Sequence, residues 1–506
     1  MRILAFLLAA AVLPMPPALP IALPAALPVP PAVHAVLPIA LPAALPVPPA
    51  VHAVLPIALP AALPVPPAVH AASADCSGAS ANDFDGDGTD DTVIGDPFAG
   101  AAGLGGAGAV HMLFGRGEGG TVVTAPRPGA GDGFGWSVRM THLDADRCAD
   151  LLIGAPYTDV SGLPDAGAVY AVYGGARRAT ARTVAPEPER DAHFGWSLAA
   201  GTTVVAVGAP HEDADGVRDA GAVYVFEPGA PDRARRISQE SPGVSGSGEV
   251  GDMFGWSVAV GGLGGLPGEE DLAVGAPYEN DDGVGRQDGE GKLDSGAIAV
   301  IFDVRGPREE YTGRKWDLHE VAPAEAGDRF GYAMAYAREG DVGYLAVSAP
   351  LGDGGGVEDS GLVRLFRAAG TAQLTPAGVF DQGAEGAAGD GYGFSLAFGG
   401  GESGEDTRLA VGIPFRGPQQ RGGVRLVPVR DPGQARLVGR GGPGDRSGWA
   451  VGFSGNRLVV GAPDRGASGA AALLGRNDAT GITLTPGTGK VPGVGGESAD
   501  FGAAVG

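Results

Sequence analysis

A short acidic segment near the start of the chain has the residue types and the spacing of a metal-binding loop. Its carboxylates stand at loop positions 1, 3, 5 and 9, as Asp83, Asp85, Asp87 and Asp91. Alternating aspartates on a tightly turning loop direct several oxygens to one point, and Gly88 at position 6 permits the turn. Calcium suits such a loop, because this ion accepts many oxygen ligands at flexible geometry. The alternative is a solvated acidic turn.

The residues that follow this loop argue against an EF-hand. An EF-hand carries a glutamate at position 12, whereas Ile94 stands there, within the apolar run Val-Ile-Gly-Asp-Pro. The loop is therefore expected to lead directly into a β-strand.

A degraded copy of the loop precedes the next apolar run. Its positions 1, 3, 5, 7 and 9 are His142, Asp144, Asp146, Cys148 and Asp150. Histidine replaces the first carboxylate, and Arg147 replaces the glycine of the turn. Asp144, Asp146 and Asp150 are therefore a weaker candidate for a second metal site, or the remains of one.

Both loops belong to a repeat that runs through the chain. One motif has the pattern Gly-Asp-x-Phe-Gly-Trp-Ser-Val, and its second glycine recurs at Gly135, Gly195, Gly255, Gly331, Gly393, Gly448 and Gly502. An apolar run ending in Gly-Ala-Pro, or a close variant, also occurs seven times, closing at Pro97, Pro156, Pro210, Pro277, Pro350, Pro414 and Pro463. Each unit contains four short apolar stretches, and four strands per unit match a propeller blade.

The order of the two motifs predicts a closed ring. The chain opens with a Gly-Ala-Pro half that lacks its Phe-Gly partner, and it closes with a Phe-Gly half that lacks Gly-Ala-Pro. Pairing of a strand at 501–505 with one at 92–94 would complete the seventh unit. A linear solenoid would need polar capping units instead. The sequence thus predicts an all-β, seven-bladed β-propeller of four-stranded blades over residues 75–506.

The paired motifs, with a calcium-type loop between them, resemble the FG-GAP repeat of integrin alpha N-terminal propellers and of secreted bacterial relatives. The resemblance covers about residues 80–506. It implies a calcium loop between the first two strands of a blade, in which four aspartates give side-chain oxygens and Thr89 gives its carbonyl. The side-chain ligands would be Asp83, Asp85, Asp87 and Asp91.

The two cysteines of the chain lie near the two acidic loops. Cys76 is seven residues before Asp83, and Cys148 lies in the equivalent loop of the next blade. The propeller interpretation puts them on the same face of the ring. A Cys76–Cys148 disulfide is therefore expected if the protein is exported.

The first 74 residues differ in kind from the rest. An apolar run at 3–13 follows Arg2 and is too short to span a bilayer of ~30 Å. An 18-residue Pro/Ala-rich segment then occurs three times, at 19–36, 37–54 and 55–72, with only its last residue changed. Its prolines rule out a regular helix. Residues 1–74 are interpreted as an export signal, and the protein is expected to be secreted, extracellular and without a membrane span.

The net charge and the absence of two catalytic motifs argue against some classes of function. A net charge of −24 repels the phosphates of nucleic acids. No HExxH or GxSxG motif is present. The favoured hypothesis is a monomeric, non-catalytic binding or adhesion module that takes an extracellular protein or glycan. The acidic loops at 211–221 and 278–296 are either solvated hairpin tips or candidate contacts for such a partner. One alternative is a hydrolase with a site at the channel, or a phospholipase-like enzyme. Another is a lectin that stacks sugars on the aromatic residue after Phe-Gly, although recurrence at one slot favours packing between blades. This residue is Trp136, Trp196, Trp256, Tyr332, Phe394 or Trp449.

Overall fold

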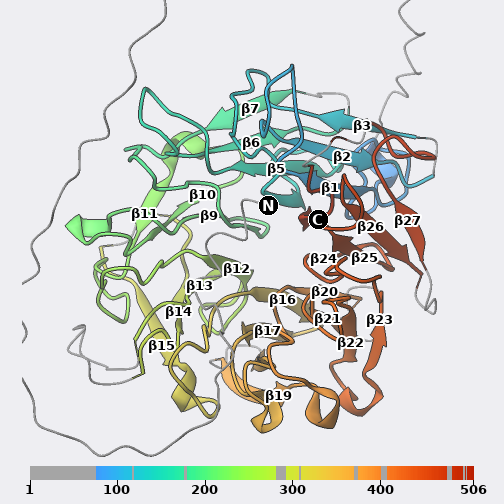
Figure 1. Ribbon diagram of the computed structural model, residues 1–506. Helices are drawn as coiled ribbons and strands as arrows, with labels where there is room; N and C mark the ends of the chain where they lie inside the picture. The colour runs from blue at the N-terminus through green and yellow to red at the C-terminus, as the bar shows by residue number, and fades with distance from the viewer. Residues whose placement is uncertain are drawn as a thin grey trace, which may run out of the picture. The chain divides into compact units, whose positions relative to one another are not determined.

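In the described part of the chain, 28 β-strands form seven antiparallel sheets of four strands each (Figure 1). The computed structural model describes residues 76–116, 119–175, 179–280, 292–306, 309–369, 374–400, 407–475, 481–493, 496 and 499–506. The predicted export signal at 1–74 lies outside these residues. None of the helices in the described ranges has the length and apolar character that crossing a membrane requires. The predicted all-β propeller with seven four-stranded blades is confirmed.

Each blade is one sheet, numbered here by its place in the chain. The first blade contains β28 (Ala504–Val505), β1 (Thr92–Asp96), β2 (Ala109–Leu113) and β3 (Gly120–Val123). The second contains β4 (Ser137–Thr141), β5 (Asp150–Ala155), β6 (Ala168–Val172) and β7 (Thr180–Thr183). The third contains β8 (Leu198–Ala200), β9 (Val205–Ala209), β10 (Ala222–Phe226) and β11 (Arg235–Ile237). The fourth contains β12 (Ser257–Gly261), β13 (Asp271–Ala276), β14 (Ala297–Phe302) and β15 (Thr312–Asp317).

The remaining blades continue the pattern. The fifth contains β16 (Met334–Glu339), β17 (Val342–Ala349), β18 (Leu362–Ala369) and β19 (Thr375–Phe380). The sixth contains β20 (Leu396–Gly399), β21 (Arg408–Gly412), β22 (Val424–Pro428) and β23 (Arg436–Val438). The seventh contains β24 (Val451–Ser454), β25 (Arg457–Ala462), β26 (Ala470–Leu474) and β27 (Ile482–Leu484). Short 3₁₀ turns are η1 (Cys76–Gly78), η2 (Ala214–Gly216), η3 (Pro231–Arg233), η4 (Leu318–Glu320), η5 (Gly354–Gly356), η6 (Gly383–Glu385) and η7 (Pro432–Gln434).

The glycines of the two repeat motifs meet where neighbouring blades touch. A Cβ added to Gly154, in Gly-Ala-Pro of the second blade, would lie 2.1 Å from the carbonyl oxygen of Gly195 in Phe-Gly of the third. Gly195 itself has φ +98°, which side chains other than hydrogen rarely permit. The hydroxyl of Ser137 donates to the same carbonyl at 2.8 Å. The close packing of neighbouring blades therefore requires the glycines of the repeat.

The phenylalanine of the motif fills the space between blades. The fully buried rings are Phe134, Phe194, Phe254, Phe330 and Phe501, with Tyr392 at the same position before the sixth blade. Phe134, for example, packs in one cluster with Val110 of the first blade and Ile153 of the second. The hydrophobic core thus consists of layers between adjacent sheets.

The first blade is assembled from the two ends of the propeller. β28 pairs antiparallel with β1, with Ile94 opposite Val505. The backbone N–H of Asp500 donates to the Asp96 carboxylate at 2.9 Å. From the seventh blade, the hydroxyl of Ser454 donates to the carbonyl of Asp91 at 2.8 Å. Chain segments from both ends therefore share one sheet and its neighbours.

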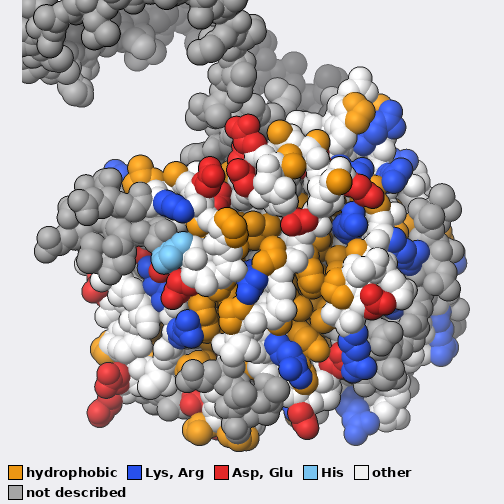
Figure 2. Space-filling model, turned by 90° about the horizontal axis from the view of Figure 1, so that it is seen from below, with side chains coloured by type: hydrophobic (Ala, Val, Ile, Leu, Met, Phe, Trp, Pro, Cys, Tyr) orange, Lys and Arg blue, Asp and Glu red, His pale blue; other side chains and the backbone are white. Residues whose placement is uncertain are grey.

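The outermost strand of each blade is an edge (Figure 1). On the side of the propeller that Figure 2 draws, hydrophobic side chains are visible between scattered Lys and Arg side chains. In β19, an edge strand, Val379 is 42% exposed. This strand also contains Pro376, and its pairing with β18 shifts register between Leu365 and Phe366. Proline and an irregular register both discourage another chain from pairing with the edge.

The antiparallel order separates the loops into two faces. The first strand of a blade begins just after Phe-Gly, and the second strand ends at Gly-Ala-Pro, so both motifs lie on one face, here called the motif face. The segments that lead into the second strand of each blade, which include the predicted metal loop before β1, lie on the opposite face, here called the metal-loop face.

Candidate metal centre

Three aspartates of the predicted metal loop converge. Asp83, Asp85 and Asp91 each offer an oxygen within 4.8 Å of the others. Asp83 and Asp91 have no exposed surface. The loop runs from η1 to β1, so the strand fixes one end of the group. Carboxylate oxygens gathered in this way are the ligands that calcium prefers.

The backbone of the loop is wrapped around Asp83. One carboxylate oxygen of Asp83 accepts hydrogen bonds from the N–H groups of Gly86, at 2.7 Å, and Asp87, at 3.1 Å. The other accepts from Gly88 at 2.6 Å. Gly88 has φ +87°, as the turn at position 6 requires. The first ligand is therefore held in place by the turn.

Asp91 joins the metal loop to the rest of the first blade. Its two carboxylate oxygens accept from the N–H groups of Phe84, at 2.9 Å, and Gly115, at 2.8 Å. Burial, and to a smaller degree the neighbouring carboxylates of Asp85 and Asp83, raise the pKa of Asp91 to about 7. A divalent cation would offset this concentration of negative charge. The donor set therefore fits calcium.

The other two predicted ligands are placed differently. Asp87 accepts a hydrogen bond from the N–H of Thr89 at 2.8 Å. Its second oxygen lies 3.8 Å from Nε of Arg116. The carboxylate of Asp87 is thus outside the converging group, and Thr89 lies on the turn that Asp87 stabilises. The structure brings together three of the four aspartates that the sequence suggested.

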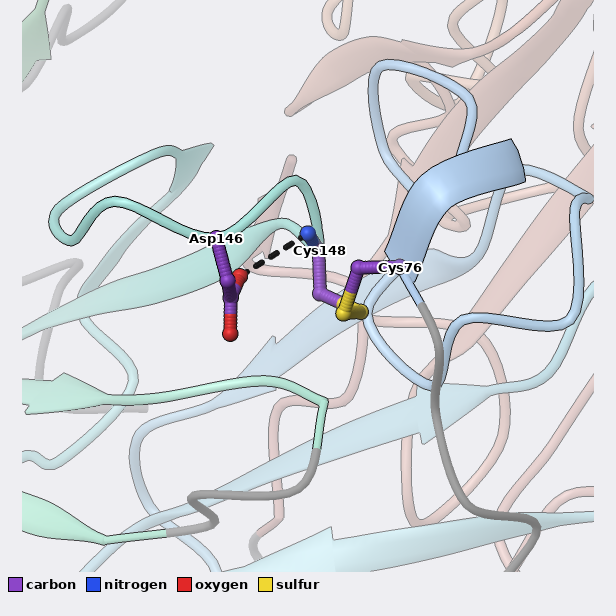
Figure 3. A group of neighbouring side chains, drawn as sticks. All are labelled: Cys76, Asp146 and Cys148. Carbon is purple, nitrogen blue, oxygen red and sulfur yellow. Dashed lines mark hydrogen bonds between the residues drawn. A yellow bond between two sulfur atoms is a disulfide. The ribbon is translucent and has the colours of Figure 1, made fainter.

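The degraded loop in the second blade does not gather its carboxylates. Within the described residues, Asp144, Asp146 and Asp150 form no group comparable to the one at Asp83. Asp144 accepts from the N–H of Asp146 at 3.1 Å, and Asp146 accepts from Cys148 at 2.9 Å (Figure 3). Asp146 and His142 are exposed. These side chains shape the turn.

Asp150 has the same structural role as Asp91. It accepts from the N–H groups of Leu143, at 2.6 Å, and Gly174, at 2.9 Å. Burial raises the pKa of Asp150 as well. Asp271 in the fourth blade, which the sequence analysis missed, does the same with Leu263 and Asp303. The signal was an aspartate six residues before the motif proline in all three blades.

A disulfide connects the two loops. Cys76 and Cys148 are bonded, as expected, and lie beside Asp146 (Figure 3). Because the two sulfurs bond to each other, neither supplies a thiolate to a metal. Two backbone hydrogen bonds reinforce the link, from the N–H of Ala149 to the carbonyl of Asp83 and from Gly175 to Phe84, both at 2.8 Å. The second loop therefore braces the first.

On the motif face, the aromatic residues that follow Phe-Gly in successive repeats contact one another from blade to blade. Neighbouring ring centroids are 4.7 to 5.6 Å apart, in the order Trp136, Trp196, Trp256, Tyr332, Phe394 and Trp449. All six are partly buried. These contacts are the packing between blades that the recurrence predicted.

The acidic loops on the motif face are tied to their own blade. In 211–221, Glu212 accepts from the hydroxyl of Tyr224 at 2.8 Å and pairs with Arg236. Asp219 lies 3.4 Å from Nδ1 of His211. Of the loop at 278–296, residues 281–291 lie outside the described residues. The carboxylates of the first loop are thus partly occupied inside the blade.

Fold and repeat together define the class of protein, a seven-bladed propeller built from FG-GAP repeats. A family model described as FG-GAP repeat matches residues 178–226. The protein is similar to Integrin alpha-PS2 of Drosophila melanogaster, with 33% identity over 164 residues, which are 29% of this chain and 11% of that protein. It is also similar to Integrin alpha-5 of Xenopus laevis, with 34% identity over 157 residues, 28% of this chain and 14% of that protein. It is an integrin-alpha-like FG-GAP propeller, and the match spans less than a sixth of either relative.

A solved structure from Bacteroides uniformis, named as a candidate 6-phosphogluconolactonase, has a TM-score of 0.45 at 12% identity. The alignment covers 82% of this chain and 98% of the other. A likeness at this level carries no argument about activity.

Proposed function

We propose that the protein is a secreted, calcium-binding module that binds an extracellular protein or glycan without catalysis. The observation that carries the proposal is the convergence of Asp83, Asp85 and Asp91 within 4.8 Å. Calcium binds buried oxygen clusters of this kind at flexible geometry. The ion would stabilise the loop and keep Asp91 ionised despite its burial.

A binding role is supported by the similarity to integrin alpha chains and by the architecture. A rigid ring presents its loops on two faces, and function in such folds is carried by loops. Export is supported by the apolar segment at 3–13 and by the Cys76–Cys148 disulfide, since disulfides persist in oxidising compartments. The protein is proposed to act as a monomer.

Calcium titration of the chelator-stripped protein tests the metal site. We expect one bound ion, and we expect Asp85→Asn to weaken calcium binding by about tenfold or more, because a ligand charge is lost. Asp144→Asn is the matched control, since Asp144 holds the same position in the loop 142–150 and its replacement should leave the affinity unchanged. Absence of calcium heat at millimolar ion, or an equal effect of both variants, contradicts the assignment.

Two further measurements test the rest of the proposal. Mass spectrometry of the protein recovered from culture medium should find a mature N-terminus near Asp75. Hydrolysis of any substrate in an ester and phosphodiester panel would contradict the non-catalytic part.

A further inference from the structure

A cavity of about 430 Å³ opens on the second blade. It lies between strands β6 and β7 and the segment 126–132, which connects β3 to β4. Its buried lining includes Thr158, Tyr170 and Asp132, and its exposed rim includes Arg127, Arg182 and Asp159. Small-molecule sites commonly have volumes of about 300–1,000 Å³.

The third blade has the same framework, but there the equivalent place is filled. Tyr170 is paired with Arg182 across β6 and β7, just as Tyr224 is paired with Arg236 across β10 and β11. In the third blade, the carboxylate of Glu212 accepts from the Tyr224 hydroxyl and from Nε of Arg236. Thr158 occupies the position of Glu212, two residues after Gly-Ala-Pro. The second blade therefore has no carboxylate at the position from which Glu212 joins tyrosine and arginine, and the carboxylate nearest to Tyr170 and Arg182 comes from Asp132 instead.

A second exchange also keeps the cavity open. Gly129 stands where the third blade has Glu189, and Asp132 stands where it has Ala192. A Cβ at Gly129 would lie 2.6 Å from Oδ1 of Asp132, so a side chain there would require the Asp132 carboxylate to move. Glu189, in contrast, reaches the loop after Gly-Ala-Pro and accepts from the N–H of Asp213 at 3.2 Å. The second blade thus has neither glutamate.

The groups around the cavity lack the partners that their counterparts have. Thr158 is only 5% exposed, and its buried Oγ1 has no hydrogen-bond partner among the described residues. Arg182 donates a 3.4 Å hydrogen bond to the carbonyl of Asp159, hydrogen-bonds the side chain of Tyr170 and attracts the Asp132 carboxylate. Arg236, by comparison, is held by two carboxylates, those of Glu212 and Asp215. A buried polar atom without a partner is unfavourable, so the site is prepared for a polar ligand.

We propose that this cavity binds a sugar acid, whose carboxylate takes the place that the Glu212 carboxylate occupies in the third blade. Arg182, the Tyr170 hydroxyl and the Thr158 hydroxyl donate to that carboxylate. Asp132 and Asp159 are acceptors, so the rest of the ligand must present hydroxyl donors, as a sugar ring does. The inference rests on the proposed binding role, but the cavity lies toward the motif face and does not use the metal loop.

The test measures binding of D-glucuronate to the protein by saturation-transfer NMR. For a single sugar acid we expect a Kd of about 1 mM, with D-glucose and acetate each about tenfold weaker. Thr158→Glu should supply the missing carboxylate from the protein itself and abolish glucuronate binding, with the unfolding temperature kept or raised. Thr121→Glu, which adds the same charge on exposed β3 outside the cavity, is the control and should bind normally. Arg182→Met should weaken binding about tenfold.

Three results would overturn the inference: no glucuronate binding at ten times the expected Kd, binding of glucose or acetate as tight as glucuronate, or full binding by Thr158→Glu. Calcium titration of the same preparation separates the two proposals. A protein that binds calcium but not glucuronate refutes the sugar-acid site and leaves the proposed function standing.

Discussion

Residues 83–91 and 142–150 occupy the same place in adjacent blades, yet only the first gathers its carboxylates at one point. In both loops the last aspartate, Asp91 or Asp150, accepts two buried backbone N–H groups. The earlier aspartates of both loops accept hydrogen bonds from N–H groups of their turns, but only Asp83 and Asp85 converge with the last aspartate. The comparison separates two roles that the acidic pattern combines: position 9 maintains the blade in both loops, and in the first loop it also joins positions 1 and 3 in a site for an ion.

Removing the disulfide should have the largest effect on this pair of loops. Cys76→Ser with Cys148→Ser releases a link between positions 72 residues apart. On the chain-entropy model this costs about 4 kcal/mol of unfolding free energy, which urea denaturation would measure. Because the loop 142–150 contacts the metal loop, calcium affinity should also fall. Unchanged calcium binding in the double variant would show that the brace does not position the ligands.

Replacing the position 9 aspartates should have the next largest effect. Asp150→Ala leaves the N–H groups of Leu143 and Gly174 without acceptors and should cost about 2–4 kcal/mol. Its calcium stoichiometry should be unchanged. Asp91→Ala should lose both stability and calcium binding, whereas Asp271→Ala in the fourth blade should lose stability alone. Calcium binding that survives in Asp91→Ala would remove the distinction between the loops.

The smallest effect concerns pH. Asp91 has a pKa of about 7 in the metal-free fold, against 3.8 ordinarily. Between these values the folded state binds more protons than the unfolded state, so the Asp91 contribution to metal-free stability decreases as pH rises through this window. Calcium needs the ionised carboxylate, so its affinity should be about tenfold higher near pH 8 than near pH 6.

Asp150 offers the comparison for this experiment. Its pKa is also raised by burial, so it too should destabilise the fold as pH rises. Saturating calcium should suppress the contribution of Asp91 and leave that of Asp150. Calorimetry at several pH values would test this, and a calcium affinity that stays flat over the range would contradict the role of Asp91.

The sequence was sufficient to predict the propeller, because the glycines and phenylalanines of its repeat are required by contacts between blades. It was also sufficient to predict that Asp83, Asp85 and Asp91 converge. It did not reveal that the Asp87 carboxylate accepts a hydrogen bond from the N–H of Thr89. Alternating aspartates have the same spacing whether they accept hydrogen bonds from a turn or bind an ion. The cavity depends on a small residue, Gly129, at the place of Glu189 and on a larger one, Asp132, at the place of Ala192. This exchange is recognised only when the two blades are compared in three dimensions.

The pairing of β28 with β1 in the first blade has a consequence for how the chain folds. The N–H of Asp500 meets Asp96 across 404 positions of sequence, and contacts of such separation form slowly. During synthesis from the N-terminus, β1 must remain an unpaired edge until the last residues arrive. The Cys76–Cys148 bond joins this waiting half-blade to the second blade, whose strands are complete much earlier. We infer that the disulfide acts as a folding clamp, which holds the first strand in place until β28 closes the ring.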